Sequence, residues 1–171
     1  SYLSDLLKSK VSNKKIISFD INSNRKIIIV SLNKNLNKSD TENLGAKCYE
    51  VFSELRKTEY YIYSDTLPNK SKNLLGYFLH GIRLKSYKFE KYKTKKNKTN
   101  ISLNVIGKNI PNSKDQMWLN AIEEGTFYAR DLVSEPGNIL HPDEYSKRIK
   151  MLSKLGLKIN VYDEKKLKKL G

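Results

Sequence analysis

A short segment bounded by two prolines, residues 135–142, constrains the fold of this chain more than any other stretch. It reads Glu-Pro-Gly-Asn-Ile-Leu-His-Pro. Pro136 has no amide proton and disfavours a helical residue before it, so a helix that reaches this point must end. Pro142 suits the first turn of a new helix, where the carboxylates of Asp143 and Glu144 meet the positive end of the helix dipole. The segment therefore predicts two helices joined by one fixed turn.

The composition is that of a folded protein of modest size. The chain has 171 residues, of which 38% are hydrophobic, enough for one core or for one core and part of a second unit. It has no apolar run of about 18 residues, which a membrane span would need, and no signal peptide is recognisable. Cys48 is the single cysteine, which excludes an internal disulfide and fits a reducing cytoplasm. Because the chain begins with Ser1 rather than Met, we expect a piece of a longer protein.

The net charge of +15 leaves two interpretations of the surface open. Only five of the 33 basic residues are arginine, and lysine is abundant together with Asn, Ile and Tyr. This mixture is typical of A+T-rich codons, and it favours lysines scattered over every solvent face. The alternative is a nucleic-acid-binding surface at residues 85–98, where Tyr87, Phe89 and Tyr92 alternate with lysines. We favour the structural interpretation, in which the aromatic rings face the core and the lysines lie on a loop.

Strands and helices alternate along the first two thirds of the chain. Alternating or continuous apolar runs predict strands at residues 16–21, 26–32, 60–63, 86–92 and 101–106, the second of them covered on both faces. Residues 93–100 are rich in lysine and predict a mobile loop. Helical spacing predicts two helices, one with the stripe Leu44, Cys48, Val51 and Leu55, and one with Leu75, Phe78, Leu79 and Ile82. Ser39 is expected to open the first of these helices through a capping box with Glu42.

The last third of the chain predicts further helices around the proline-bounded turn. A long helix is expected at residues 113–134, opened by a capping box at Ser113, with a core-facing stripe of Trp118, Ile122, Gly125, Ala129 and Leu132. The next helix should run from Pro142 to Gly156 with Tyr145, Ile149 and Leu152 facing inward, followed by a strand at 157–162 and a short helix capped by Asp163. These patterns predict an α/β fold with a mixed or mostly parallel sheet flanked by helices. We expect three parts: a domain at 1–112, a linker helix and turn at 113–140, and the incomplete beginning of a second domain at 141–171.

No catalytic, metal-binding or substrate-binding residue can be assigned from the residue patterns. His80 lies on an amphipathic helix and His141 at a helix start, so a satisfied or solvent-facing side chain and a local cap are favoured over catalysis. Cys48 falls on a buried stripe and is expected to be an inert thiol. The paired carboxylates, which are Glu123-Glu124, Asp143-Glu144 and Asp163-Glu164, point about 100° apart on a helix and cannot hold one ion together. All eight glycines are isolated, which weighs against a phosphate-binding loop.

The segment from Gly125 to Pro142 resembles the connection between the two domains of leucyl aminopeptidases, also called cytosol aminopeptidases. The matching residues are Ala129, Arg130, Leu132, Val133, Pro136, Asn138 and Pro142. Ser134 stands where the family usually has Asn, and His141 where it has Thr. A second resemblance, to a recurring Gly-x-x-Leu-x-x-Tyr-x-Phe-x-x-Tyr segment, covers residues 81–93. The resemblance implies a macrodomain-like amino-terminal domain, the linker helix and the start of the catalytic domain.

The same resemblance implies a cytoplasmic metallopeptidase that removes amino-terminal residues from peptides. The family implies two divalent ions, manganese or zinc, and a hexamer of paired trimers. Its metal-binding motif, Asn-Thr-Asp-Ala-Glu-Gly-Arg, does not occur in this sequence, so no catalytic or metal-binding residue is carried over. The expected role of this stretch is to shape access to the active site and to contribute to assembly. Without the catalytic domain's sheet, the strand at 157–162 is expected to pair with a second copy or to dock loosely, with residues 135–138 acting as a hinge.

Overall fold

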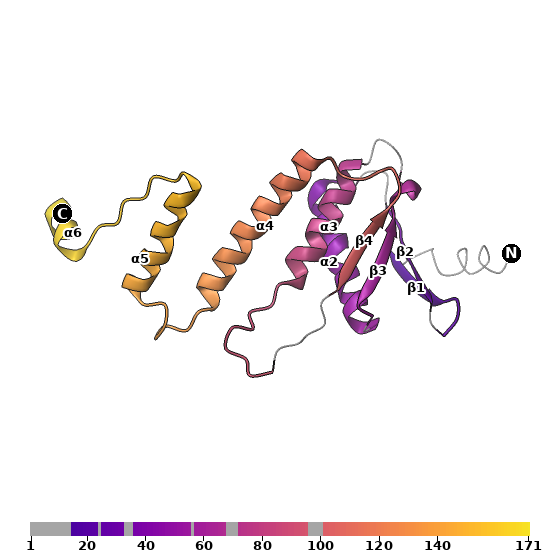
Figure 1. The fold of residues 1–171 in the computed structure, drawn as a ribbon, viewed down its shortest axis with the longest axis horizontal. Coiled ribbons are helices and arrows are strands. Elements are labelled where there is room, and N and C mark those ends of the chain that lie inside the picture. Colours follow the sequence, from indigo (N-terminus) through magenta and orange to yellow (C-terminus); the bar gives the residue numbers. More distant parts are fainter. Residues whose placement is uncertain (1–14, 24, 33–35, 56, 68–71, 96–100) are drawn as a thin grey trace. The chain divides into compact units, whose positions relative to one another are not determined.

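A computed structural model describes the chain at residues 15–23, 25–32, 36–55, 57–67, 72–95 and 101–171. Its contacts form two compact units, Ser1–Glu124 and Gly125–Gly171, and the boundary falls inside one long helix, α4 (Ser113–Ser134) (Figure 1). The architecture is mixed α/β, with small sheets and flanking helices, which confirms the predicted fold class.

Two pairs of strands form the sheets of the first unit. β1 (Ile16–Asp20) and β2 (Lys26–Val30) pair antiparallel, with Ile17 opposite Ile29. β3 (Glu59–Tyr63) and β4 (Ser102–Ile106) pair parallel, with Ile62 opposite Val105. The sequence predicted a β2 covered on both faces, but the strand is half-buried along its whole length. Ile28 and Val30, which share one face, are the residues of β2 that pack against the core cluster.

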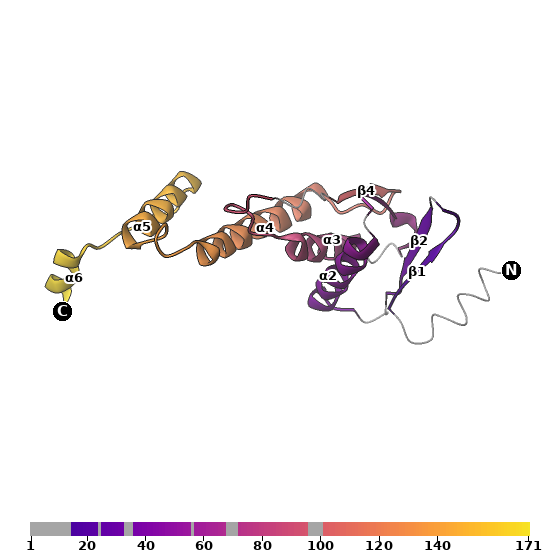
Figure 2. The same ribbon diagram turned by 90° about the horizontal axis from the view of Figure 1, so that it is seen from below.

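The core of the first unit lies between these strands and two helices, α2 (Lys38–Leu55) and α3 (Lys72–Ser86). Figures 1 and 2 show the two helices side by side next to the strands. The buried cluster consists of Leu44, Cys48, Tyr49, Phe52, Leu75, Phe78 and Ile82. Strand residues such as Tyr60, Ile62 and Val105 pack against it. The predicted stripe of α2 is confirmed at Leu44 and Cys48, whereas Val51 and Leu55 are only half-buried.

Asparagines cap α2 and α4, so the two predicted serine caps were wrong. The side chain of Asn37 accepts from the backbone N–H of Asp40 at 2.7 Å. Asn112 accepts from the N–H of Asp115 at 2.8 Å and donates back to its carboxylate at 2.7 Å. Ser39 therefore lies inside α2 and Ser113 begins α4 after its cap. Asn and Ser are about equally good caps, and sequence alone does not decide between adjacent candidates.

The predicted strand at residues 86–92 does not form. α3 continues to Ser86, whose hydroxyl donates to the carbonyl oxygen of Arg83 at 2.7 Å, and the backbone after it is irregular with a turn at Lys91 and Tyr92. Alternation favours a strand only where another strand is available for backbone pairing. The predicted loop at 93–100 lies mostly outside the described residues.

The buried face of α4 differs from the predicted one by one residue. Trp118 is 55% exposed and Ile122 is 37% exposed, whereas Leu119 and Glu123 are buried. Leu119 lies against Gly76 of α3, where a side chain would crowd its Cδ1 atom. The small residue on the neighbouring helix, and not the hydrophobicity of α4 itself, therefore selects the face that is buried.

The second unit contains α5 (Pro142–Met151), the 3-10 turn η3 (Leu152–Leu155) and α6 (Glu164–Leu170). Three local predictions are confirmed: Pro142 begins α5, Gly156 follows η3 with a φ of +86°, and the Asp163 side chain accepts from the N–H of Lys166. The predicted strand at 157–162 is wrong, since this stretch has no regular structure. No neighbouring strand accepts its backbone hydrogen bonds within the described part of the chain.

Candidate functional site

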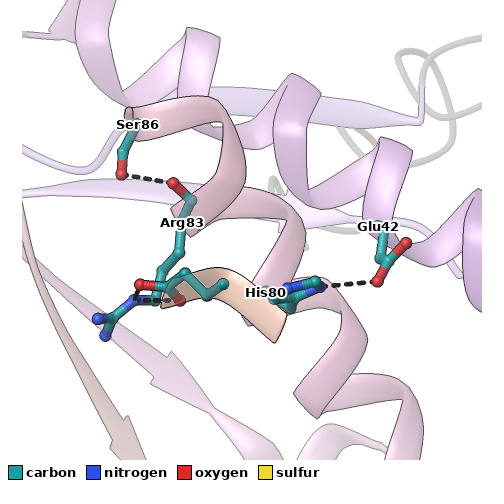
Figure 3. A network of polar contacts seen from close by, with 5 residues as sticks. Glu42, His80, Arg83 and Ser86 are labelled. Atoms are coloured by element: carbon teal, nitrogen blue, oxygen red, sulfur yellow. Dashed lines mark hydrogen bonds and ion pairs between the residues drawn. The ribbon is translucent and has the colours of Figure 1, made fainter. Parts of the chain in front are cut away.

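A group of polar side chains lies where α2, α3 and the first half of α4 meet (Figure 3). We call it the helix-junction network; it comprises Glu42, His80, Arg83, Ser86 and Glu123. His80 is only 5% exposed, and its Nδ1 lies 2.8 Å from Oε1 of Glu42. An ionised carboxylate only accepts hydrogen bonds, so Nδ1 carries the proton. Nε2 is buried without a hydrogen-bond partner in the described structure, so the prediction of a satisfied histidine holds for one ring nitrogen.

Two glycines bring the helices of this network together. A Cβ atom added at Gly45 would collide with the carbonyl oxygen of Phe78, and one added at Gly81 would collide with the backbone of Glu42. α2 and α3 therefore meet backbone to backbone at both positions. Because His80 precedes Gly81, its ring is held beside Glu42, although 38 residues separate the two in sequence.

An ion pair extends the network to α4. Nε of Arg83 lies 2.8 Å from Oε2 and 3.0 Å from Oε1 of Glu123. The Glu123 side chain is 8% exposed and the Arg83 side chain is 60% exposed, so water screens the cation but reaches little of the carboxylate. In the sequence, Glu123 stands out only as a neighbour of Glu124. Glu123 lies one helical turn after Leu119 on the buried side of an amphipathic helix, and this spacing could have indicated a buried carboxylate.

Polar side chains also gather at the carboxyl ends of β3 and β4, a common place for ligands in parallel sheets. The buried hydroxyl of Ser64 donates to the carbonyl oxygen of Ile106 at 3.1 Å. The carboxylate of Asp65 accepts from the N–H of Lys108 at 2.6 Å. These two hydrogen bonds connect the segment after β3 to the end of β4 and the loop that follows it, and each is made to a backbone atom.

The candidate nucleophile and the second histidine have no catalytic geometry. Cys48 is 1% exposed, and burial raises the pKa of its thiol from 9.0 to about 12, so it stays protonated at neutral pH. His141 is the N-cap residue of α5, which confirms the predicted position, although its side chain makes no capping hydrogen bond. Its carbonyl oxygen instead accepts from the N–H of Tyr145 at 2.9 Å.

Four of the six paired carboxylates, those of Glu123, Glu144, Asp163 and Glu164, make structural contacts. Glu144 pairs with Arg148 at 3.1 Å, Asp163 caps α6, and Glu164 pairs with Lys168 at 2.6 Å. No group of three His, Cys, Asp or Glu side chains that could hold a metal ion occurs among the described residues. These residues do not fit the two-ion site that the family resemblance implies.

The described part of the basic segment holds several of its lysines in local contacts. Lys85 pairs with Glu50 of α2 at 2.8 Å, and Nζ of Lys91 lies 5.5 Å from the ring centre of Tyr92. Tyr87 and Phe89 are half-buried. None of the described helices is both long and apolar enough to cross a membrane.

Curated relatives of the sequence are cytosol aminopeptidases. The probable cytosol aminopeptidase of Phytoplasma mali is 33% identical over 154 residues, which are 85% of this chain and 31% of the relative. That of Wolbachia pipientis is 32% identical over 154 residues, 86% of this chain and 30% of the relative. No protein-family model matches the sequence. The chain belongs to the cytosol aminopeptidase family.

Solved structures share the fold. A mutant of tomato leucine aminopeptidase superposes with a TM-score of 0.76 at 19% identity, over 98% of this chain and 36% of the other. The bottromycin maturation enzyme BotP gives a TM-score of 0.71 at 16% identity, over 100% and 38% of the two chains. This member of the cytosol aminopeptidase family therefore spans about a third of the length of its relatives and matches their amino-terminal part. The resemblance found at residues 125–142 is confirmed.

Proposed function

We propose that this chain is the non-catalytic amino-terminal part of a metal-dependent aminopeptidase of the cytoplasm, which removes amino-terminal residues from peptides. The proposal rests on the unequal coverage of the alignment with the Phytoplasma mali relative, which spans 85% of this chain but 31% of the relative. The catalytic residues then belong to the part of the family's length that this chain does not span.

The proposed role of this stretch is to shape access to the active site and to contribute to assembly of a hexamer. Residues 1–112 would form the amino-terminal domain, 113–140 the linker helix and turn, and 141–171 the beginning of the catalytic domain. The absence of any buried residue in α5 and α6 supports an assignment of these helices to a domain whose remainder covers them.

The two divalent ions of the proposed enzyme, manganese or zinc, would be held by residues outside this stretch. A structure of the related fold of BotP is a complex with Mn, which supports manganese as one of the two candidates. The carboxylates of Glu123, Glu144 and Asp163 take part in ion pairs and a helix cap, so we assign none of them to the ions.

The test is an aminopeptidase assay on the purified chain with a leucyl chromogenic substrate and added Mn²⁺ or Zn²⁺. We expect no hydrolysis by the 171-residue chain, with a full-length cytosol aminopeptidase as the positive control. Metal-dependent hydrolysis that persists when the chain is purified to homogeneity would contradict the proposal.

The alternative function, a basic nucleic-acid-binding module, rests on the net charge of +15. We expect any binding to be weak and non-specific, and to fall steeply with salt because it depends on counterion release. The measurement is fluorescence anisotropy with labelled duplexes of two unrelated sequences. Selective binding of one duplex that survives at about 0.2 M salt would favour the alternative.

A further inference from the structure

We propose that Arg148 is a brace that fixes the turn between α4 and α5, which we call the elbow (residues 136–141). Nη1 of Arg148, in the last turn of α5, lies 2.8 Å from Oε1 of Glu135, the residue that follows α4. The Glu135 side chain is only 1% exposed, and that of Arg148 is 21% exposed. A charged hydrogen bond with so little water around it links the two sides of the elbow.

A second carboxylate on α5 orients the guanidinium group. Oε1 of Glu144 lies 3.1 Å from Nε of Arg148, one helical turn away. Glu144 thus holds the arginine from within α5, and Glu135 holds it from across the elbow. The hydrogen bonds that the Arg148 guanidinium donates, to Glu135 first and then to Glu144, raise its pKa above the ordinary value, so its charge is permanent.

α5 contributes no fully buried apolar side chain to the elbow. No residue of α5 is buried, and Tyr145, which was expected to face inward, is 46% exposed. The backbone of the elbow is compact, because the N–H groups of Ile139 and Leu140 both donate to the carbonyl oxygen of Pro136 at 2.9 Å. The side-chain contact across the elbow is therefore a charge pair. The proposed brace is an alternative to the expected hinge at residues 135–138, and the two experiments below decide between them.

Three charge-neutralising variants distinguish an ion pair that fixes the elbow from an ion pair that only stabilises α5. Glu135→Gln removes the charge that pairs with Arg148 across the elbow, and Glu144→Gln removes the charge that pairs with it within α5. Lys147→Gln is the matched control, because it removes a charge from an exposed neighbour of Arg148 on the same helix. We expect amide exchange at Ile139 and Leu140, measured by NMR, to accelerate by about tenfold in Glu135→Gln and to stay unchanged in Lys147→Gln. A smaller acceleration is expected in Glu144→Gln.

A distance measurement tests the brace directly. Spin labels at Gly125→Cys and Lys150→Cys lie on opposite sides of the elbow, and an added side chain at position 125 meets no atom within 4 Å. Cys48 stays in place, because its buried thiol does not react. We expect one narrow distance distribution in the chain with Arg148, and in Lys147→Gln, and a broad one in Arg148→Gln and Glu135→Gln. A distribution that is already broad with Arg148 present, or one that Glu135→Gln leaves narrow, would overturn the proposal.

Discussion

The two units of this chain form their helices in different ways. In the first unit, α2 and α3 are held by buried side chains such as Leu44 and Phe52, and their backbones touch at Gly45 and Gly81. In the second unit, α5 and α6 begin at strong local signals, but neither helix has a buried residue. The exposed Leu155, at 77%, is typical of this unit. Local signals thus suffice to place the ends of a helix, whereas its stability in water depends on tertiary burial.

The largest contrast is expected in the reactivity of cysteines. Because burial raises the pKa of Cys48 from 9.0 to about 12, it should react with iodoacetamide at pH 8 at least about a thousandfold more slowly than a cysteine introduced at the exposed Gly125. Mass spectrometry of a digest measures both rates in one Gly125→Cys sample. Since the folded-state pKa is raised, the neutral thiol contributes stability below about pH 9, and this contribution is lost as the pH rises toward 12. Equal labelling rates would show that α2 does not bury its stripe.

Truncation of an apolar side chain should lower the free energy of unfolding by several kcal/mol more in the first unit than in the second. Phe52 is 4% exposed and stacks on Tyr60 with ring centres 4.0 Å apart. We expect Phe52→Ala to lower the free energy of unfolding by about 3–5 kcal/mol in urea titrations. Leu155→Ala, the matched truncation in the second unit, should change it by less than about 0.5 kcal/mol. A comparable loss in both variants would mean that the second unit has a core of its own.

A smaller effect tests where α2 begins. Replacement of Asn37 by Ala removes the acceptor for the N–H of Asp40 and should cost about 1 kcal/mol of stability. Ser39→Ala, at the predicted cap, should change the stability by less than about 0.5 kcal/mol. Thermal melts measure both losses of stability. A larger loss in Ser39→Ala than in Asn37→Ala would show that the serine caps the helix.

The sequence predicted those helix starts, ends and caps that depend only on residues close together in the chain. Pro142 at a helix start, Gly156 after a helix end and Asp163 as a cap each act within a few residues, and all three were confirmed. Alternation at 86–92 and 157–162 also suggested strands, but a strand requires a partner that the local pattern does not reveal. Both stretches are irregular.

The polar contacts of the site were not predictable, because distant residues make them. Glu42 and His80 meet only because Gly45 and Gly81 allow α2 and α3 to approach closely. The face of α4 that is buried depends in the same way on a glycine of another helix, opposite Leu119. Trp118 was the more hydrophobic candidate for that face, and it is largely exposed.

The central claim is that the second unit lacks the surfaces that would stabilise it, as expected for the beginning of a domain. Amide hydrogen exchange of the dilute monomer tests it most directly, with residues 157–162 compared with β3 and β4 in the same sample. The account predicts strong protection of the two strands and exchange at 157–162 close to that of an unstructured peptide. Protection at 157–162 as strong as in β3 would contradict it, because these residues would then belong to a folded core within this chain.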